Sequence, residues 1–508
     1  ATQLISFSQS PRSILHVYFN MMDASQNVGT AAASSSTADD LPEPLGERHT
    51  LQPQEELRVE IPFGVDGAQF TLQKGSCELW GCELALGKTY SIANGGIQLA
   101  IFTWHGCVVD VHANVDISYT SDETDPNVSF VNTHAQLEAL RDEAFQQSGA
   151  GRQGPRVMIV GPPESGKSSL CKTLIAYAVK VGRTPLWVDL DPNDNAISVP
   201  GTLAVAPMLS AAVTVESYAT SGIPPNTVPP LVMWHGGSKT LNGDLFRAQV
   251  DRIAACINAR LQEDELARSS GIIVNTNGWI QDEGFKLLLH AAEALEISVI
   301  LIMGHDRLYS MMNNHYSKQP DVVEVPKVLK LPRSGGVVSR PEPFLRQVRS
   351  RAVKRYFYGD MIYPPKTSDA TTSTTTLTAT GSLTKIPQLT PFLLQIPFAE
   401  VEIFKLSSMA LSSSLLPVAQ QQTTDAIQIQ PVPLDEALQH SLLAVCHPAA
   451  VQSYRESGRG RDLWTAGVAG FCVVERVVME SDTLHLLSPC AGSLPSKTLL
   501  LGEITWME

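Results

Sequence analysis

A glycine-rich segment in the first third of the chain carries the strongest chemical signal. Residues 161–168 read Gly-Pro-Pro-Glu-Ser-Gly-Lys-Ser, a complete G-x-x-x-x-G-K-[ST] pattern. Such a loop binds phosphate because its backbone N–H groups and the N-terminus of the next helix face the oxygens. Lys167 would reach the β- and γ-phosphates, and the Ser168 hydroxyl would bind Mg²⁺. The pattern predicts a nucleoside triphosphate site; the alternative is a glycine-rich turn with an incidental lysine.

A phosphate loop of this kind works with a carboxylate on a neighbouring strand, which holds the metal or accepts a proton. Asp189 and Asp191 lie at the end of the apolar run 186–190. Ligands of α/β sheets bind at the carboxyl ends of the strands, which favours Asp191 as Mg²⁺ ligand and general base. Asp189 has the simpler alternative of a solvated charge at a strand end.

The segments around these residues predict an α/β P-loop domain with a mostly parallel, doubly wound sheet over 148–362. Nearly continuous apolar runs, typical of strands buried on both faces, occupy 157–160, 186–190, 272–275 and 297–303. Helical stretches such as 168–181 separate them. Alternation of strand and helix indicates parallel pairing.

The flanking regions have a β pattern. Short alternating runs at 57–61, 68–72, 77–80 and 98–104 predict an N-terminal β-sandwich over 48–147. It would end in a helix from His134 to Gln147, capped by Asn132 or Thr133. Runs at 403–406, 469–474 and 498–501 predict a mostly β C-terminal domain over 386–508. Composition predicts disorder in 1–47 and low-complexity insertions at 363–385 and 423–433.

The overall composition excludes several classes of protein. The 508 residues include 37 Lys and Arg and 51 Asp and Glu, which gives a net charge of −14. The chain as a whole therefore does not complement the negative charge of nucleic acid. We therefore expect no DNA partner, and any RNA contact needs a local basic patch. No uncharged apolar run approaches the roughly 20 residues of a membrane-spanning helix. Eight cysteines without a C-x-x-C pair indicate reduced thiols of an intracellular protein and no zinc site.

Further segments carry a resemblance to a known family. The chain reads Ser-Val-Pro-Gly-Thr at 198–202, Thr-Asn-Gly-Trp at 276–279, Leu-Pro-Arg-Ser-Gly-Gly-Val-Val at 331–338 and Tyr-Phe-Tyr-Gly at 356–359. Together with the P-loop, these segments resemble the polynucleotide 5′-hydroxyl kinase family, and more narrowly its branch in the mRNA cleavage and polyadenylation machinery. The resemblance extends over about 55–508, since 102–107 and 468–471 fit the same branch.

The resemblance implies roles for individual residues. Thr276 and Trp279 are similar to the family's clasp, in which the indole stacks on an RNA base; Trp279 could instead anchor the strand end in the core. Arg346 and Arg349 fall in a lid whose arginines meet the transferring phosphoryl group; a basic surface helix or an import signal is the alternative. The implied ATP-binding set is Glu56, Gln98 (a Lys in relatives), Gly161, Glu164, Ser165, Gly166, Lys167, Ser168 and Ser169.

Two departures from the family pattern concern catalysis. Active relatives follow the aspartate with a Gly-Gln pair, where this chain has Asn193 and Asp194 after Asp191 and Pro192. The extra carboxylate would oppose RNA near the γ-phosphate unless another cation compensates. Ala352 occupies a lid position that resembles an arginine site.

Three hypotheses follow. The first is an ATP- and Mg²⁺-binding, non-catalytic subunit of the nuclear complex that cleaves and polyadenylates pre-mRNA. ATP would hold the three domains together, and the partners would be a scaffold subunit and other 3′-end processing proteins, with RNA as a further candidate. The second is an active polyribonucleotide 5′-hydroxyl kinase with Asp191 as general base. The third is an unrelated P-loop NTPase switch, which is not a GTPase because the N-K-x-D motif is missing.

Overall fold

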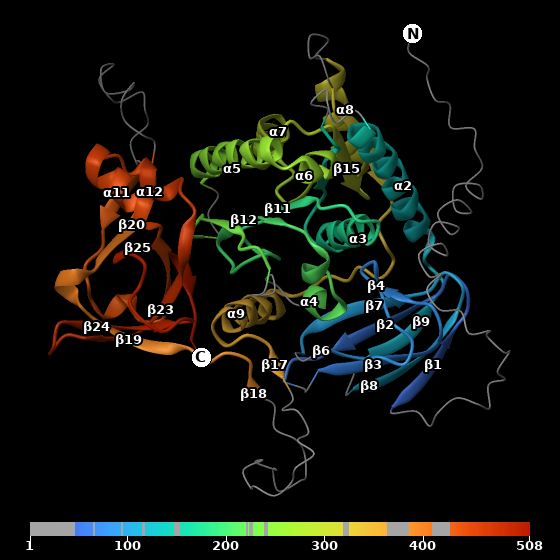
Figure 1. Ribbon diagram of the computed structural model, residues 1–508, viewed down its shortest axis with the longest axis horizontal. Helices are drawn as coiled ribbons and strands as arrows, with labels where there is room; N and C mark the ends of the chain where they lie inside the picture. The colour runs from blue at the N-terminus through green and yellow to red at the C-terminus, as the bar shows by residue number, and fades with distance from the viewer. Residues whose placement is uncertain are drawn as a thin grey trace, which may run out of the picture.

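The computed structural model describes residues 46–64, 67–92, 95–113, 117–146, 153–219, 222, 227–237, 242–318, 325–362, 386–408 and 427–507. Figure 1 shows an N-terminal β-sandwich in blue, a central α/β domain in green to yellow, and a C-terminal, mostly β domain in orange to red. This architecture confirms the predicted fold class. The predicted domain boundaries stay predictions. The expectation of disorder in 1–47 and of an insertion at 363–385 falls outside the described residues, apart from residues 46 and 47.

The N-terminal sandwich contains strands in which buried and partly exposed side chains alternate, as β7 (Ile97–Phe102) shows most clearly. In the strand Ile97–Phe102, Ile97, Leu99 and Ile101 enter the core while Gln98 points to the other face. One sheet has the order β1 (Glu47–Leu51), β8 (Cys107–Ala113), β3 (Ala68–Gly75), β6 (Thr89–Ile92); the other has β5 (Cys82–Glu83), β4 (Glu78–Leu79), β7 (Ile97–Phe102), β2 (Glu56–Ile61), β9 (Ile117–Ser121).

A long helix joins the sandwich to the central domain, and it begins earlier than predicted. Helix α2 spans Asp125–Gln146, so the expected start at His134 was wrong. A proline and an acidic residue favour the first turn of a helix, and Asp125 and Pro126 supply both. Asn132 and Thr133 therefore lie inside the helix and neither is its cap; the Thr133 hydroxyl donates to the Ser129 carbonyl at 2.8 Å.

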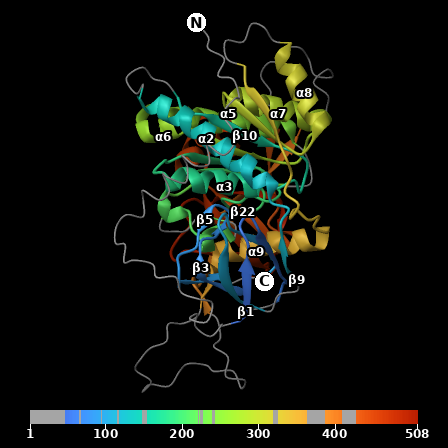
Figure 2. The ribbon, with the colours of Figure 1, turned by 90° about the vertical axis from the view of Figure 1, so that its right-hand side faces the viewer.

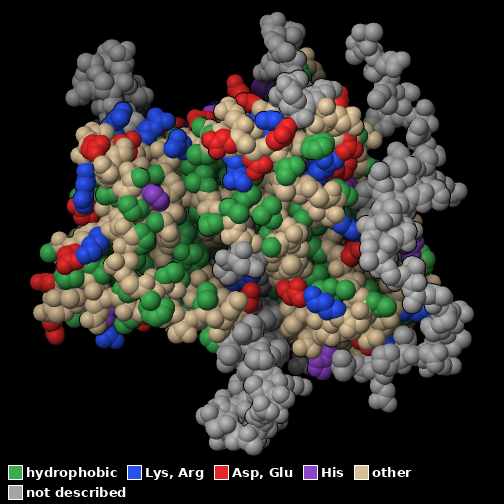
Figure 3. All heavy atoms as spheres, viewed as in Figure 1, with side chains coloured by type: hydrophobic (Ala, Val, Ile, Leu, Met, Phe, Trp, Pro, Cys, Tyr) green, Lys and Arg blue, Asp and Glu red, His purple; other side chains and the backbone are tan. Residues whose placement is uncertain are grey.

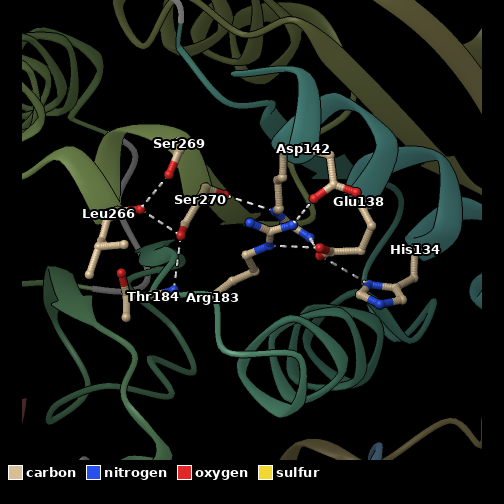
Figure 4. A network of polar contacts seen from close by, with 9 residues as sticks. His134, Glu138, Asp142, Arg183, Thr184, Leu266, Ser269 and Ser270 are labelled. Atoms are coloured by element: carbon tan, nitrogen blue, oxygen red, sulfur yellow. Dashed lines mark hydrogen bonds and ion pairs between the residues drawn. The ribbon is translucent and has the colours of Figure 1, made fainter. Parts of the chain in front are cut away.

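A buried polar network fixes α2 to the central domain (Figure 4). Glu138 accepts from Arg141 on its own helix and, at 2.8 Å, from Arg183 Nε in the segment after helix α3 (Lys167–Lys180). Arg141, fully buried, also donates to the Ser270 carbonyl at 2.9 Å. The Ser270 hydroxyl accepts from the Thr184 backbone at 2.9 Å. Figure 2 shows the resulting position of α2, which lies across α3 above the sandwich.

The central sheet is mostly parallel. Its order is β13 (Leu231–Trp234), β12 (Thr202–Pro207), β11 (Leu186–Leu190), β14 (Ile272–Thr276), β10 (Arg156–Val160), β15 (Val299–Met303), β16 (Lys327–Leu331). The five strands from β11 to β16 pair in parallel, whereas β12 and β13 extend the sheet as antiparallel strands. Strands β10, β11, β14 and β15 are buried throughout, as their continuous apolar runs predicted.

Helices cover both faces of this sheet. Helix α3 (Lys167–Lys180) packs on the face that carries Val157 and Ile159, while α5 (Gly243–Glu263) and α7 (Asp282–Ala294) pack on the face that carries Met158 and Val160. The other helices in the described part of this domain are α4 (Val215–Ala219), α6 (Glu265–Ser270), α8 (Asp306–Ser317) and α9 (Glu342–Tyr358), with a 3₁₀ turn at Ser210–Ala212.

In its described residues, the C-terminal domain forms a seven-stranded sheet and two helices. Its order is β19 (Phe392–Pro397), β24 (Thr483–Ser488), β23 (Val468–Val478), β22 (Ser441–Cys446), β25 (Thr498–Thr505), β20 (Glu402–Ser408), β21 (Ile427–Pro431), with α11 (Pro448–Ser457), α12 (Arg461–Trp464) and 3₁₀ turns at Phe398–Glu400 and Glu436–Leu438. The expected insertion at 423–433 was wrong for its described part, because buried Ile427 begins edge strand β21.

The C-terminal sheet packs against the antiparallel edge of the central sheet. The fully buried amide of Gln249 on α5 donates to the carbonyl of Trp234 on β13 at 2.8 Å and to that of Trp464 on α12 at 3.2 Å. The Tyr356 hydroxyl of α9 accepts from the Phe471 backbone of β23 at 3.0 Å. A two-stranded ribbon of β17 (Met361–Ile362) and β18 (Ile386–Pro387) leads from α9 into this domain.

Candidate nucleotide-binding site

The P-loop connects β10 to α3 and is built around its glycines. Gly166 has φ +90°, in the left-handed region, and caps α3. A Cβ on Gly161 would lie 2.7 Å from Ser165 Oγ, so a larger residue would displace the loop. Lys167 is only 7% exposed, and its ammonium donates to the Pro162 carbonyl at 2.8 Å. Burial lowers the pKa of Lys167, and the nearby Asp191 and Asp189 partly offset this effect.

The two aspartates beside the loop have different surroundings. Asp189 is fully buried and accepts from the backbones of Asp191 at 3.0 Å and Ala196 at 2.9 Å. It also accepts from the Asn275 amide at 3.1 Å, and that amide lies 3.2 Å from Ser168 Oγ. Burial and the charge of Asp191 raise the pKa of Asp189 to about 7. Asp189 thus fixes the loop after β11, and its solvated alternative was wrong.

Asp191 lies at a cavity of 460 Å³ above the P-loop. Its carboxylate accepts from the Asn193 backbone at 2.9 Å, and burial raises its pKa. Ser168 lines the same cavity. Its hydroxyl and the Asp191 carboxylate are oxygen donors of the kind that Mg²⁺ prefers. Other predicted residues that line the cavity are Gln98, Glu164, Ser165, Gly166, Lys167, Ser169, Trp279 and Arg349. Gly161, the first residue of the loop, lines neither this cavity nor a smaller one beside it.

The smaller cavity, of 170 Å³, lies between the sandwich and α3. Glu56 and Gln98 line it from the sandwich, and Ser165, Gly166 and Ser169 line it from the P-loop side. Glu56 is 4% exposed and accepts from Arg58 Nε at 2.6 Å. Burial raises the pKa of Glu56, whereas Arg58 opposes the rise. The structure therefore brings the two predicted sandwich residues to the same loop as Lys167.

The predicted clasp is only partly at the cavity. Thr276 is 1% exposed, and its hydroxyl donates to the Ile159 carbonyl at 2.7 Å, so it joins β14 to β10 and does not face the cavity. Gly278 lies against the P-loop, because a Cβ there would be 2.7 Å from the Pro163 nitrogen. Trp279 is half-buried; it lines the cavity and also packs on Phe246, with ring centroids 6.2 Å apart.

The predicted lid residues separate in a similar way. Arg349 on α9 lines the cavity and pairs with Glu342, whereas Arg346 is exposed and lines neither cavity. Ala352 does not line the cavity, but its neighbour Arg351 does. Arg351 donates to the Gly96 carbonyl of the sandwich at 3.0 Å. Burial lowers its pKa to about 10, and Asp194 opposes that change.

Three cationic side chains that line the cavity were not predicted as site residues: Lys172, Arg340 and Arg351. Lys172 follows Ser168 by four positions on α3, so helical periodicity could have found it. Its ammonium donates to the Tyr218 carbonyl at 2.5 Å and lies 5.1 Å from the Trp80 ring centroid. Burial lowers its pKa to about 8. No motif or periodicity near Arg340 pointed to the site. Its Nη2 lies 3.8 Å from Asp194 Oδ2, so Arg340 is the cation that offsets the extra carboxylate of Asp194.

Family models match three successive parts of the chain. Residues 50–144 match the "N-terminal beta-sandwich domain of polyadenylation factor". Residues 161–359 match "mRNA cleavage and polyadenylation factor CLP1 P-loop", and residues 389–508 match "Pre-mRNA cleavage complex II protein Clp1". The three matched segments follow the same order as the three parts of the structure.

Similar whole proteins are found by sequence and by structure. "Protein CLP1 homolog" of Nematostella vectensis is 33% identical over 459 residues, which covers 90% of this chain and 96% of the relative. The Drosophila persimilis protein of the same name is 34% identical over 469 residues, covering 91% and 98%. Among solved structures, "Structure of wild-type Clp1p-Pcf11p (454 -563) complex" has a TM-score of 0.71 at 22% identity, covering 92% of this chain and 99% of that chain. A second has a TM-score of 0.70 at 19% identity, covering 91% and 100%; its title names an "Extended interface between Pcf11p and Clp1p and structural basis for ATP loss in Gly135Arg point mutant".

Proposed function

The chain belongs to the CLP1 family of mRNA cleavage and polyadenylation factors, and from this premise we propose that it is an ATP-holding subunit of the nuclear pre-mRNA cleavage complex. In this role it binds nucleotide tightly and transfers its γ-phosphate slowly or not at all.

The observation that carries the proposal is the pair of cavities on the two sides of residues 165–169. The larger cavity holds the groups that would bind the triphosphate and Mg²⁺: Lys167, Ser168 and Asp191. The smaller one has walls from two domains, with Glu56 and Gln98 opposite Ser169. Bound Mg²⁺ would neutralise phosphate charge. A ligand held between domains stabilises the folded state, by about 2.7 kcal/mol at 100 times its Kd.

The charges around the larger cavity argue against an efficient kinase. Its cationic side chains are Lys167, Lys172, Arg340, Arg349 and Arg351, and its carboxylates are Glu164, Asp191, Asp194 and Glu342. The near balance leaves little positive charge for an RNA strand once a triphosphate is bound. The Trp279 indole still lines the cavity, so a weak contact with an RNA base is part of the proposal.

The partners follow from the family. Relatives of known structure were solved with Pcf11p, and we propose that this chain likewise docks on a scaffold subunit of the cleavage complex. Protein rather than DNA suits the surface, because acidic and basic side chains are mixed on the face shown in Figure 3 and the net charge is −14. No helix among the described ranges is long and apolar enough to cross a bilayer.

The test uses the full chain, purified without added nucleotide. Heat-released nucleotide is identified by chromatography, and the protein is then incubated with γ-labelled ATP and a 5′-hydroxyl oligoribonucleotide. We expect co-purified adenine nucleotide and no label on the RNA. Lys167→Ala serves as the control for background transfer. Efficient label transfer that depends on Lys167 would establish the kinase instead, and a protein free of nucleotide that ignores excess ATP would refute both.

A further inference from the structure

Glu164 of the P-loop is held by the segment that leads into helix α9. Its Oε1 accepts from the Arg340 backbone at 2.7 Å and from Arg340 Nε at 3.3 Å. Its Oε2 accepts from the Ser339 hydroxyl at 2.9 Å. Glu164 has φ +53°, a left-handed conformation that is costly for a residue with a side chain. Three donors from one short segment therefore maintain a strained residue in the phosphate-binding loop.

The same arginine reaches across to the loop that follows β11. Arg340 Nη2 lies 3.8 Å from Asp194 Oδ2, and both side chains are about a third exposed, at 30% and 39%. Glu164, Asp194 and Arg340 all line the larger cavity. They come from three separate segments, the P-loop, the loop after β11 and the approach to α9, and all three side chains stay partly exposed where they meet at this cavity.

We propose that Arg340 is a latch: its contacts with Glu164 and Asp194 must open before a nucleotide enters or leaves the larger cavity. This inference rests on the proposed function, in which the chain retains ATP. It gives Asp194 a role in this chain, as the far anchor of the latch. Arg340 is then a positioning residue that governs exchange of the nucleotide.

A residue that acts as a latch affects the binding kinetics differently from a residue that only binds the phosphate. Opening is required in both directions, so weakening the latch raises the association and dissociation rate constants together. Removal of an arginine that only bound phosphate would raise the dissociation rate constant without raising the association rate constant. Charge effects also differ: loss of a cation slows the association of a triphosphate, and loss of an anion slows its dissociation.

The experiment is stopped-flow fluorescence with methylanthraniloyl-ATP and Mg²⁺ on the full chain. For Arg340→Met, which removes a charge-assisted contact, we expect both rate constants to rise about tenfold. For Asp194→Asn, which removes a partly exposed ion pair, we expect both to rise about threefold. Lys354→Met removes an exposed charge from the same region, on α9, and should change neither.

Other outcomes overturn the latch. Unchanged rate constants in both variants would do so, as would a rise in the dissociation rate constant of either variant without a rise in its association rate constant. Because Asp194 is partly exposed, Asp194→Asn should fold even if Arg340→Met does not. The proposed function fails differently, through a wild-type protein that gives no binding signal at all.

A second measurement needs no nucleotide. The Arg340 amide donates to Glu164, so in the apo protein it should exchange with deuterium more slowly than an unbonded loop amide. Glu164→Ala should remove that protection, whereas Lys354→Met should leave it. Fast exchange of this amide in the wild-type protein would refute the latch whether or not ATP binds.

Discussion

The hydroxyl of Tyr177 on helix α3 donates to the carboxylate of Glu78 in the sandwich, across the boundary between two domains. Both residues line the smaller cavity. Burial raises the pKa of Glu78 to about 7, and Glu83 adds to the rise while Tyr177 and Lys180 oppose it. The packing of these two domains therefore depends on the protonation state of Glu78.

Glu78→Gln should flatten the dependence of stability on pH. Between the ordinary glutamate pKa and about 7, the folded state binds more protons than the unfolded state at this site. The contribution of Glu78 to the free energy of unfolding is therefore greatest below the ordinary glutamate pKa, and it is lost as the pH rises through about 7. At pH 8 the glutamine variant should be more stable by up to about 3 kcal/mol.

The measurement is the melting temperature of both proteins from pH 5 to pH 8. Some slope should persist in the variant, because Asp189 has a pKa raised to about 7 and acts in the same direction. Parallel curves for the two proteins would contradict the assignment to Glu78.

Gly278→Ala should weaken nucleotide binding as well as stability. The added methyl would lie 2.7 Å from the Pro163 nitrogen, so the P-loop must shift. Overpacking of this kind costs about 1–3 kcal/mol. We expect about a tenfold loss of ATP affinity by calorimetry, which corresponds to about 1.4 kcal/mol.

Gly182→Ala is the matched control for that variant. Gly182 has φ +85° with no atom within 4 Å of the added Cβ, so alanine there costs about 1 kcal/mol of backbone strain without a clash. It should lower the melting temperature and leave ATP affinity unchanged. Equal effects of the two variants on affinity would show that general destabilisation is the cause.

Gln249→Leu should loosen the C-terminal domain. The variant leaves the buried carbonyls of Trp234 and Trp464 without this donor, at about 1–3 kcal/mol for each group. Urea unfolding should then begin at a lower concentration. Gln452→Leu, on the exposed surface of α11, should stay within about 0.5 kcal/mol of the wild type. An unchanged unfolding curve for Gln249→Leu would contradict this role.

Lys167→Ala should abolish the stabilisation that ATP gives. Wild-type protein should gain about 2.7 kcal/mol at 100 times the Kd, measured as a rise in melting temperature. The alanine variant should show no such rise, whereas Lys286→Ala, on the exposed side of α7, should behave as the wild type. A full shift in the Lys167 variant would exclude the P-loop as the triphosphate site.

Local features were the predictable ones. The P-loop, the buried strands and helix α3 depend on residues close in sequence, and the chain carries them as motif and periodicity. The start of α2 was missed because the apolar spacing considered began at Leu137, after the capping signals at Asp125 and Pro126. Propensity also does not reveal that β12 pairs antiparallel with β11.

Long-range contacts at the site were not predictable from one sequence. Glu164 and Arg340 are 176 residues apart, and nothing near either residue indicates the other. Thr276 was assigned to the clasp by resemblance, but its hydroxyl satisfies a backbone carbonyl of the adjacent strand. A motif fixes which residues are near the phosphate, whereas packing decides which way each one points.

The ribbon of β17 and β18 has a practical consequence. Met361 pairs with Pro387 and Ile362 with Ile386, so the two ends of the intervening segment are held side by side where the chain passes from the central domain to the C-terminal domain. Each doubling of the length between such anchored ends costs only about 0.6 kcal/mol. A fluorescent protein inserted between these strands should therefore leave the arrangement of the three domains unchanged. Its signal would then report assembly of the complex in living cells.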